Sequence, residues 1–95
     1  MKKVERTFKL RLFDESATSK ASALRREMKV GELWHGNGRV PISGMISYRG
    51  RVDAVITFFV DQFFTDEIFQ SGDTLVLVSS QGEASVVLAR REGSA

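Results

Sequence analysis

The chain has 95 residues, of which 42% are hydrophobic, so it is long enough to bury a core and too apolar to remain disordered. It contains no cysteine, which excludes disulfides, thiolate nucleophiles and cysteine-bound zinc. The formal net charge of +2 is small compared with that of strongly basic nucleic-acid-binding domains.

The ends of the chain and its hydropathy predict its organisation. We expect one domain over residues 1–95, with frayed ends at residues 1–6 and 91–95. The polar N-terminus lacks the apolar core of a signal peptide, and the longest apolar run, residues 54–60, is far shorter than a membrane span. The sequence therefore predicts a cytoplasmic protein that does not contact a membrane.

The charges are distributed unevenly along the chain. Residues 1–51 carry twelve Lys or Arg against five acids, a net +7, and residues 52–95 carry two Arg against seven acids, a net −5. Either the two halves interleave in the fold and neutralise each other, or a basic face remains and binds an acidic partner or a nucleic acid. The candidate residues of that face are Lys9, Arg11, Arg25, Arg26, Lys29 and Arg39.

Period-two alternation predicts the first strand at residues 7–13, with its even positions on the core face.

The next segment, residues 17–34, has two interpretations. Residues 17–28 carry four apolar side chains at helical spacing, which favours a short helix. The alternative is a loop followed by a strand at residues 28–34, in which Val30 and Trp34 share a face.

A turn at residues 35–38, rich in Gly and Asn, precedes a second alternating run at residues 40–48. Ser43 and Gly44 interrupt this run, and a bulge or a bend is expected there. Pro41 has no N–H for a ladder, so the strand is expected to begin at an edge or to open at this position.

The middle of the chain, residues 52–69, holds five of the seven Phe and is the expected folding nucleus. Residues 52–60 alternate as a central strand does. The apolar positions that follow have helical spacing: Val60, Phe63, Phe64 and Ile68. With Asp61 as the cap, this spacing predicts a short helix at about residues 62–70.

Residues 74–79 and 84–90 are two apolar runs joined by a Gly-containing turn, which is the signature of a β-hairpin. In total, the sequence predicts five or six strands with one or two short helices. Because most of the connections are short, we expect a mainly β fold (α+β), with a small antiparallel sheet that closes partly or fully into a barrel.

The second half of the chain resembles a known family. Residues 52–90, which combine a strand, a helix-like excursion and the run GDTLVLVSSQGEASVVLAR, are similar to the last strands of the C-terminal β-barrel of translational GTPases. The resemblance covers fewer than half of the residues, and the GGR and GYRP-type motifs of that barrel are missing from the first half. It implies a module that contacts protein and RNA and has no catalysis of its own.

The residues that carry chemistry do not form a recognisable catalytic pattern. His35 is the only histidine, and with Glu32 alone nearby a metal site would lack its remaining ligands. A lone histidine in a turn is usually solvated. Residues 36–41 lack the third Gly of a dinucleotide fingerprint, and Ser43 lacks the Gly neighbours of a nucleophile elbow. We expect no enzyme activity, catalytic residue, cofactor or metal.

Aromatic side chains outside the predicted core indicate binding instead. Trp34 and the second face of the Phe-rich segment would anchor a protein partner or a second copy of the chain. The aromatic and the two arginines of residues 48–51 could also stack a base and clamp a phosphate. The predicted partner-binding residues are Trp34, Tyr48, Arg49, Arg51, Phe64 and Phe69.

These patterns together predict a small non-enzymatic interaction module that docks a protein partner through the aromatic patch and the basic face of the N-terminal half. The alternative is a nucleic-acid-binding β-barrel that uses Tyr48, Arg49, Arg51 and the neighbouring Lys and Arg side chains. A third possibility is a translation-factor-like barrel module, as the resemblance implies.

Overall fold

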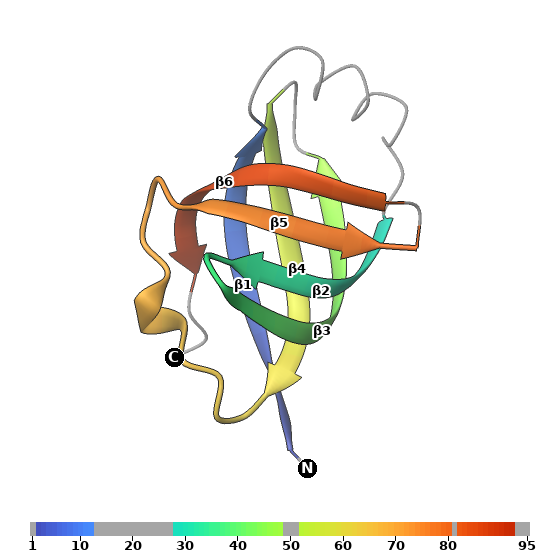
Figure 1. Ribbon diagram of the computed structural model, residues 1–95, viewed down its shortest axis with the longest axis vertical. Coiled ribbons are helices and arrows are strands. Elements are labelled where there is room, and N and C mark those ends of the chain that lie inside the picture. Colours follow the sequence, from blue (N-terminus) through green and yellow to red (C-terminus); the bar gives the residue numbers. More distant parts are fainter. Residues whose placement is uncertain (1, 13–27, 49–51, 81, 93–95) are drawn as a thin grey trace.

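The computed structural model of the protein describes residues 2–12, 28–48, 52–80 and 82–92. Within these residues the chain forms a closed barrel of six antiparallel strands (Figure 1). The elements are β1 (Lys3–Leu12), β2 (Met28–His35), β3 (Gly38–Tyr48), β4 (Asp53–Asp61), the 3-10 turn η1 (Asp66–Ile68), β5 (Thr74–Ser79) and β6 (Gly82–Glu92). The strand order around the barrel is β1-β4-β3-β2-β5-β6. The predicted mainly β, antiparallel, closed architecture is therefore confirmed.

The barrel interior is filled by the alternating apolar positions of the strands. In β4, for example, Ala54, Ile56, Phe58 and Val60 are all buried, as the alternation predicts. The described buried core consists of Phe8, Leu10, Val30, Leu33, Ile42, Ile46, Ala54, Ile56, Phe58, Val60, Phe69, Leu75, Leu77, Val86 and Leu88. No polar or charged residue of the described part is buried with them.

The pairing of β2 with β3 is irregular, close to the bulge or bend that the sequence predicts. Val30 pairs with Gly44, but the register then shifts before Glu32. Because the shift interrupts the two-residue period of β2, Val30 and Leu33 are both buried, and Trp34 lies on the outer face of the barrel. The prediction that Val30 and Trp34 share a face is wrong for this reason.

The predicted helix at residues 62–70 is also wrong. The described segment contains only the three-residue turn η1. Ahead of η1, the Asp61 side chain accepts a hydrogen bond from the Phe63 N–H (2.8 Å). The apolar residues do not form one stripe, since Phe64 and Phe69 pack inward while Phe63 is 80% exposed. Tertiary packing of those two rings outweighs the helical spacing.

Two other expectations concern the limits of the elements. The predicted helix at residues 17–28 lies outside the described residues except for Met28, which begins β2. At the chain ends, β1 begins at Lys3 and β6 ends at Glu92, so strand structure extends into both ranges expected to fray. None of the helical structure in the described part is long and apolar enough to cross a membrane.

Candidate functional site

The connection between β4 and β5 is the least regular part of the described barrel. This crossover segment, residues 62–73, runs across the end of the barrel at which β1 begins and β4 ends (Figure 1). It covers that end with an aromatic cluster. The ring centroids are 5.1 Å apart for Phe8 and Phe58, 5.3 Å for Phe8 and Phe69, 5.4 Å for Phe64 and Phe69, and 6.0 Å for Phe58 and Phe64. These are the separations of stabilising aromatic pairs, so the segment is fixed to the core.

The C-terminal part of the crossover segment is attached to β2 through His35. The imidazole stacks on the Phe69 ring at 4.3 Å, and its Nε2 lies 2.8 Å from Asp73 Oδ2. The same carboxylate oxygen accepts a hydrogen bond from the Gln70 N–H (2.9 Å). The Gln70 hydrogen bond, followed by the His35 contact, lowers the pKa of Asp73. His35 therefore has a structural role here and is not the solvated turn residue that the sequence suggests.

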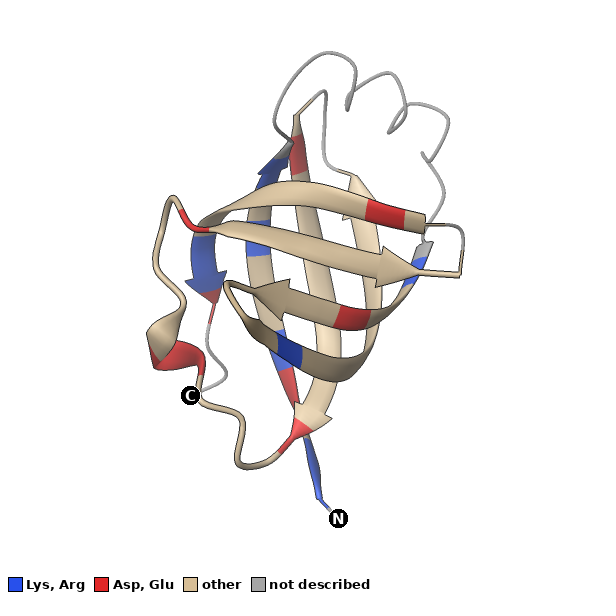
Figure 2. Cartoon of the chain, viewed as in Figure 1, with Lys and Arg blue, Asp and Glu red and all other residues tan. Residues whose placement is uncertain are grey.

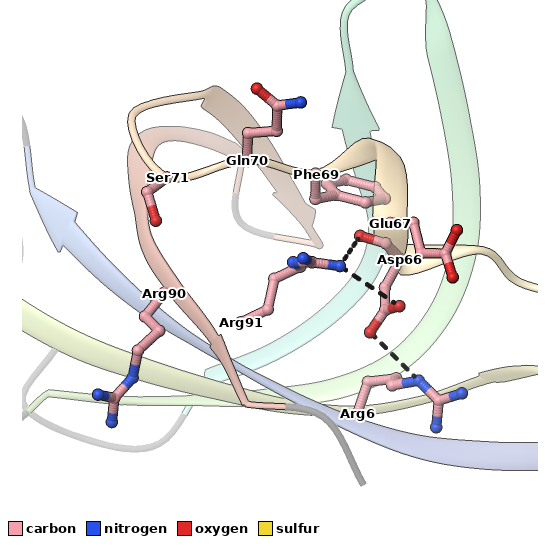
Figure 3. A pocket seen from close by; sticks show the side chains of 8 residues that line it. All are labelled: Arg6, Asp66, Glu67, Phe69, Gln70, Ser71, Arg90 and Arg91. Carbon is pink, nitrogen blue, oxygen red and sulfur yellow. Dashed lines mark hydrogen bonds and ion pairs between the residues drawn. The ribbon is translucent and has the colours of Figure 1, made fainter. Parts of the chain in front are cut away.

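The centre of the crossover segment is attached to β1 and β6 by Asp66. Its carboxylate lies 3.6 Å from Arg6 Nε and 3.7 Å from Arg91 Nη1, and Arg91 Nη1 also donates to the Asp66 carbonyl (2.8 Å). Figure 3 shows the end of the Arg91 side chain directed at Asp66, and the Nε atom of Arg6 facing the Asp66 carboxylate. The charged groups thus converge where strands and crossover segment meet.

A pocket of about 600 Å³ opens beside these ion pairs. Its lining residues are Arg6, Asp66, Glu67, Phe69, Gln70, Ser71, Arg90 and Arg91. In Figure 3, Glu67 and Arg90 point away from the Asp66 carboxylate, and Arg90 donates to Glu92 (2.6 Å). The pocket therefore presents three guanidinium groups, two carboxylates and hydrogen-bonding side chains.

The crossover segment also carries large apolar side chains that face away from the core. Phe63 is 80% and Ile68 is 62% exposed, whereas Phe59, on the wall of the barrel, is 48% exposed. Ile68 lies between two residues that line the pocket, Glu67 and Phe69. Exposed apolar side chains and a pocket lined by charged residues of both signs are therefore found on one segment that is held at several points.

Trp34 forms a separate cluster on the outer face of the barrel. The Arg39 Cζ atom lies 3.8 Å from the centroid of the indole ring, which is a cation–π contact, and the indole N–H donates to the Glu32 carboxylate. Across the ladder, Trp34 is opposite the half-buried Val76 of β5. The predicted residues Trp34 and Arg39 are thus brought together on the surface.

The other predicted partner-binding residues do not join that surface. Phe69 is fully buried, so its prediction as a surface anchor is wrong: the ring is needed to close the barrel end. Phe64 and Tyr48 are half-buried and pack against the core, and burial raises the pKa of the Tyr48 hydroxyl. Arg49 and Arg51 lie outside the described residues.

Two of the six predicted basic residues meet acids of the other half of the chain. Lys9 Nζ lies 3.2 Å from Glu92, and Arg11 Nε lies 3.8 Å from Asp53. Figure 2 shows the Lys and Arg positions of β1 and β6 among the acids of β4 and the crossover segment.

Of the remaining candidates, Lys29 is exposed, and Arg25 and Arg26 lie outside the described residues. Where the chain is described, the ion pairs therefore agree with interleaving of the two halves.

Sequence reasoning missed several residues of this site, among them Arg6, Phe63, Asp66, Ile68 and Arg91. Arg6 could have been found from the sequence, because it is an even position like Phe8 and Leu10. It lies on the same face of β1 as they do if the predicted strand is extended toward the N-terminus. Arg91 has no such signal. A register shift between Lys9 and Leu10 changes its face, and a shift of that kind cannot be seen in alternation.

Among the described residues, no group of three or more His, Asp or Glu side chains is placed to hold a metal ion. No family model matches the chain, and no curated protein or solved structure matches it either. In the part of the chain that the structure describes, the fold is that of a small six-stranded antiparallel β-barrel with a crossover segment over one end.

Proposed function

We propose that this chain is a small non-enzymatic binding module that docks a protein partner through its crossover segment. The observation that carries the proposal is the exposure of Phe63 (80%) and Ile68 (62%) on a segment whose neighbouring residues are fixed to the barrel. Single exposed apolar residues are common, but two on one short connection indicate a contact surface.

The anchoring of the segment favours binding. Asp66, Asp73 and Phe69 hold it by ion pairs, hydrogen bonds and ring packing, so little conformational entropy remains to be lost when a partner binds. Burying one Phe or Ile side chain contributes roughly 1.5–3 kcal/mol. Phe63 and Ile68 together would therefore supply a substantial part of the free energy of a moderate-affinity complex.

The Trp34 cluster is a second candidate contact of the same module. Trp and Arg are enriched among the residues that dominate binding energies, and here Arg39 holds the indole ring in place. This cluster contains Trp34, which the sequence suggested for partner binding, and Arg39, which it suggested for an acidic partner or a nucleic acid.

The docking function is tested by capturing partners from the lysate of the source organism, with nuclease present, on the wild-type chain and on the double variant Phe63→Ser/Ile68→Ser. We expect the double variant to lose a protein that the wild type retains, and mass spectrometry identifies it. Phe59→Ser is the matched control, because Phe59 is an exposed aromatic on the barrel wall. Equal retention by the wild type and the double variant would contradict the proposal.

Salt dependence distinguishes protein docking from the nucleic-acid alternative. Phosphate contacts weaken steeply with salt, whereas an apolar contact does not. We therefore expect retention to persist between about 50 and 200 mM salt, a range over which a typical nucleic-acid complex loses several orders of magnitude in affinity. A steep loss of retention that also requires Tyr48, Arg49 and Arg51 would favour the nucleic-acid-binding barrel.

A further inference from the structure

Trp34 and Arg39 form a stacked pair on the outer wall of the barrel. They lie opposite each other in the ladder of β2 with β3, next to the pair of His35 and Gly38 that closes the hairpin turn. Residues opposite each other in a ladder share a face of the sheet, so both side chains point outward. The Arg39 Cζ atom lies 3.8 Å from the centroid of the indole ring, and Arg39 is exposed. The ring therefore orients an exposed guanidinium group.

Arg39 differs from the other described arginines because it has no carboxylate partner. Five arginines lie in the described part of the chain, and the other four form ion pairs with carboxylates: Arg6, Arg11, Arg90 and Arg91. No carboxylate of the described residues lies within ion-pair distance of Arg39, which contacts the face of the indole ring instead. A cation–π contact leaves the N–H donors at the edge of the guanidinium plane unused. These donors of Arg39 therefore remain available to a ligand.

Glu32, on the same face of β2, holds the indole ring and not the guanidinium group. Its carboxylate accepts a hydrogen bond from the indole N–H, which is the single donor of the ring. That bond fixes the ring in its own plane, and the fixed ring orients the guanidinium stacked on it. Because the Arg39 fork is oriented before a ligand arrives, binding costs little side-chain entropy.

The charges of the surrounding surface favour a single carboxylate as the ligand. Glu32 is opposite Val78 of β5, and Val78 is opposite Glu83 of β6, so two acids share this face with Arg39. A nucleic acid binds through several phosphates, which these acids would repel. One carboxylate needs only the planar fork of Arg39, which matches its two oxygens.

We propose, on the basis of the docking function above, that Arg39 binds the carboxylate of an acidic side chain of the protein partner. Trp34 acts as the positioning residue. The half-buried Val76 lies opposite Trp34, and the half-buried Val78 lies two residues further along β5, so the surface beside the fork is apolar. The partner segment therefore carries an acidic residue next to apolar ones.

Trp34 is the only tryptophan of the chain, so its fluorescence reports on this site directly. The test titrates two capped tripeptides, acetyl-Leu-Glu-Leu-amide and acetyl-Leu-Gln-Leu-amide, into isotopically labelled protein and follows Trp34 fluorescence and the Arg39 Nε–Hε NMR signal. The Glu peptide is expected to shift that signal and to bind about tenfold more tightly than the Gln peptide, because a hydrogen bond to a charged group is stronger than one to a neutral group. Equal affinities would overturn the proposal, and tighter binding of inorganic phosphate than of the Glu peptide would overturn the assignment to a carboxylate.

The variant Arg39→Gln removes the charge and the fork but keeps an amide donor, and it is expected to abolish the preference for the Glu peptide. Arg39 is exposed and has no ion pair with a described residue, so the variant should keep the thermal unfolding transition of the wild type. Arg11→Gln is the matched control, because Arg11 is also exposed on a strand but is paired with Asp53. A preference that survives Arg39→Gln, or that Arg11→Gln abolishes as well, would overturn the proposal.

Partner capture separates this proposal from the docking function. We expect Arg39→Gln to reduce capture of the protein that the wild type retains. If Phe63→Ser/Ile68→Ser prevents capture and Arg39→Gln leaves it unchanged, the docking function stands and the carboxylate contact fails. If neither variant reduces capture, the docking function itself fails.

Discussion

Gly44 stands opposite Phe58 in the barrel wall, where there is no room for a side chain. A Cβ atom added at Gly44 would lie 2.9 Å from the Phe58 Cβ, closer than real Cβ atoms approach. Both atoms belong to paired strands, so relief requires a backbone shift. We expect Gly44→Ala to lower the free energy of unfolding by about 1–3 kcal/mol, as overpacking of a core does.

Urea denaturation of Gly44→Ala measures this loss directly. Gly31→Ala is the matched control, because nothing lies within 4 Å of a Cβ added at Gly31. Similar losses for the two variants would mean that the contact with Phe58 is not the cause.

The lowered pKa of Asp73 gives the crossover segment a defined pH dependence. Because the folded-state pKa lies below the ordinary value of 3.8, the ionised carboxylate contributes stability at pH values above about 4. That contribution is lost as the pH falls through the folded-state pKa, when the carboxylate that accepts from Gln70 and contacts His35 becomes protonated. Asp73→Asn should therefore be less stable than wild type at pH 7, and the difference should shrink below pH 4.

Urea denaturation between pH 3 and pH 7 checks this dependence. Asp53→Asn removes an exposed ion pair with Arg11 and should change stability by less than about 0.5 kcal/mol. A difference between wild type and Asp73→Asn that is constant with pH would show that the lost interaction is not the ionised carboxylate.

At the scale of elements, the strands could be predicted from the sequence and the crossover segment could not. The alternation of β4 and of the β5–β6 hairpin is carried by local sequence, and the structure follows it. The crossover segment depends on long-range partners, because Phe69 packs on Phe8 and His35, far away in sequence. Periodicity in a short window contains no information about those partners.

The difference between local and long-range contacts also explains which residues of the candidate site could be predicted from the sequence. Trp34 was identified as an aromatic side chain and Arg39 as a basic one, and the β2–β3 hairpin places them opposite each other. Phe63 and Ile68 were assigned to the inner stripe of a helix that does not form. Arg91 lies opposite Phe8 only because of a bulge in the pairing of β6 with β1.

The crossover segment allows a direct comparison of two nearby phenylalanines. Phe69→Ala should cost about 3–5 kcal/mol of unfolding free energy, because it leaves a cavity among Phe8, Phe64 and His35. Phe63→Ala should change stability by no more than about 0.5 kcal/mol, since the side chain is 80% exposed. Urea denaturation of both variants measures the contrast. Comparable losses would support the helical arrangement of the segment instead.

At the scale of the whole molecule, closure of the barrel pairs the first strand, β1, with the last strand, β6. β1 lies between β4 and β6, so the first strand is completed only when the last one is present. The same arrangement mixes the charges, since the basic side chains of β1 meet Asp53, Asp66 and Glu92 from the acidic half. A sequence with halves of net +7 and −5 therefore folds into a barrel with mixed charges along β1.

This closure predicts that a chain shortened to residues 1–80 does not fold. Without β6, which pairs with both β1 and β5, the core residues Phe8, Leu10, Leu75 and Leu77 lose the partners that cover them, and two strand edges are left open. Far-UV circular dichroism should show an unfolded chain with no cooperative thermal transition. A chain of residues 1–92, which keeps all six described strands, is the control and should unfold cooperatively, as single small domains do. A cooperative transition in the shorter chain would mean that five strands form a stable sheet and that closure is not required for folding.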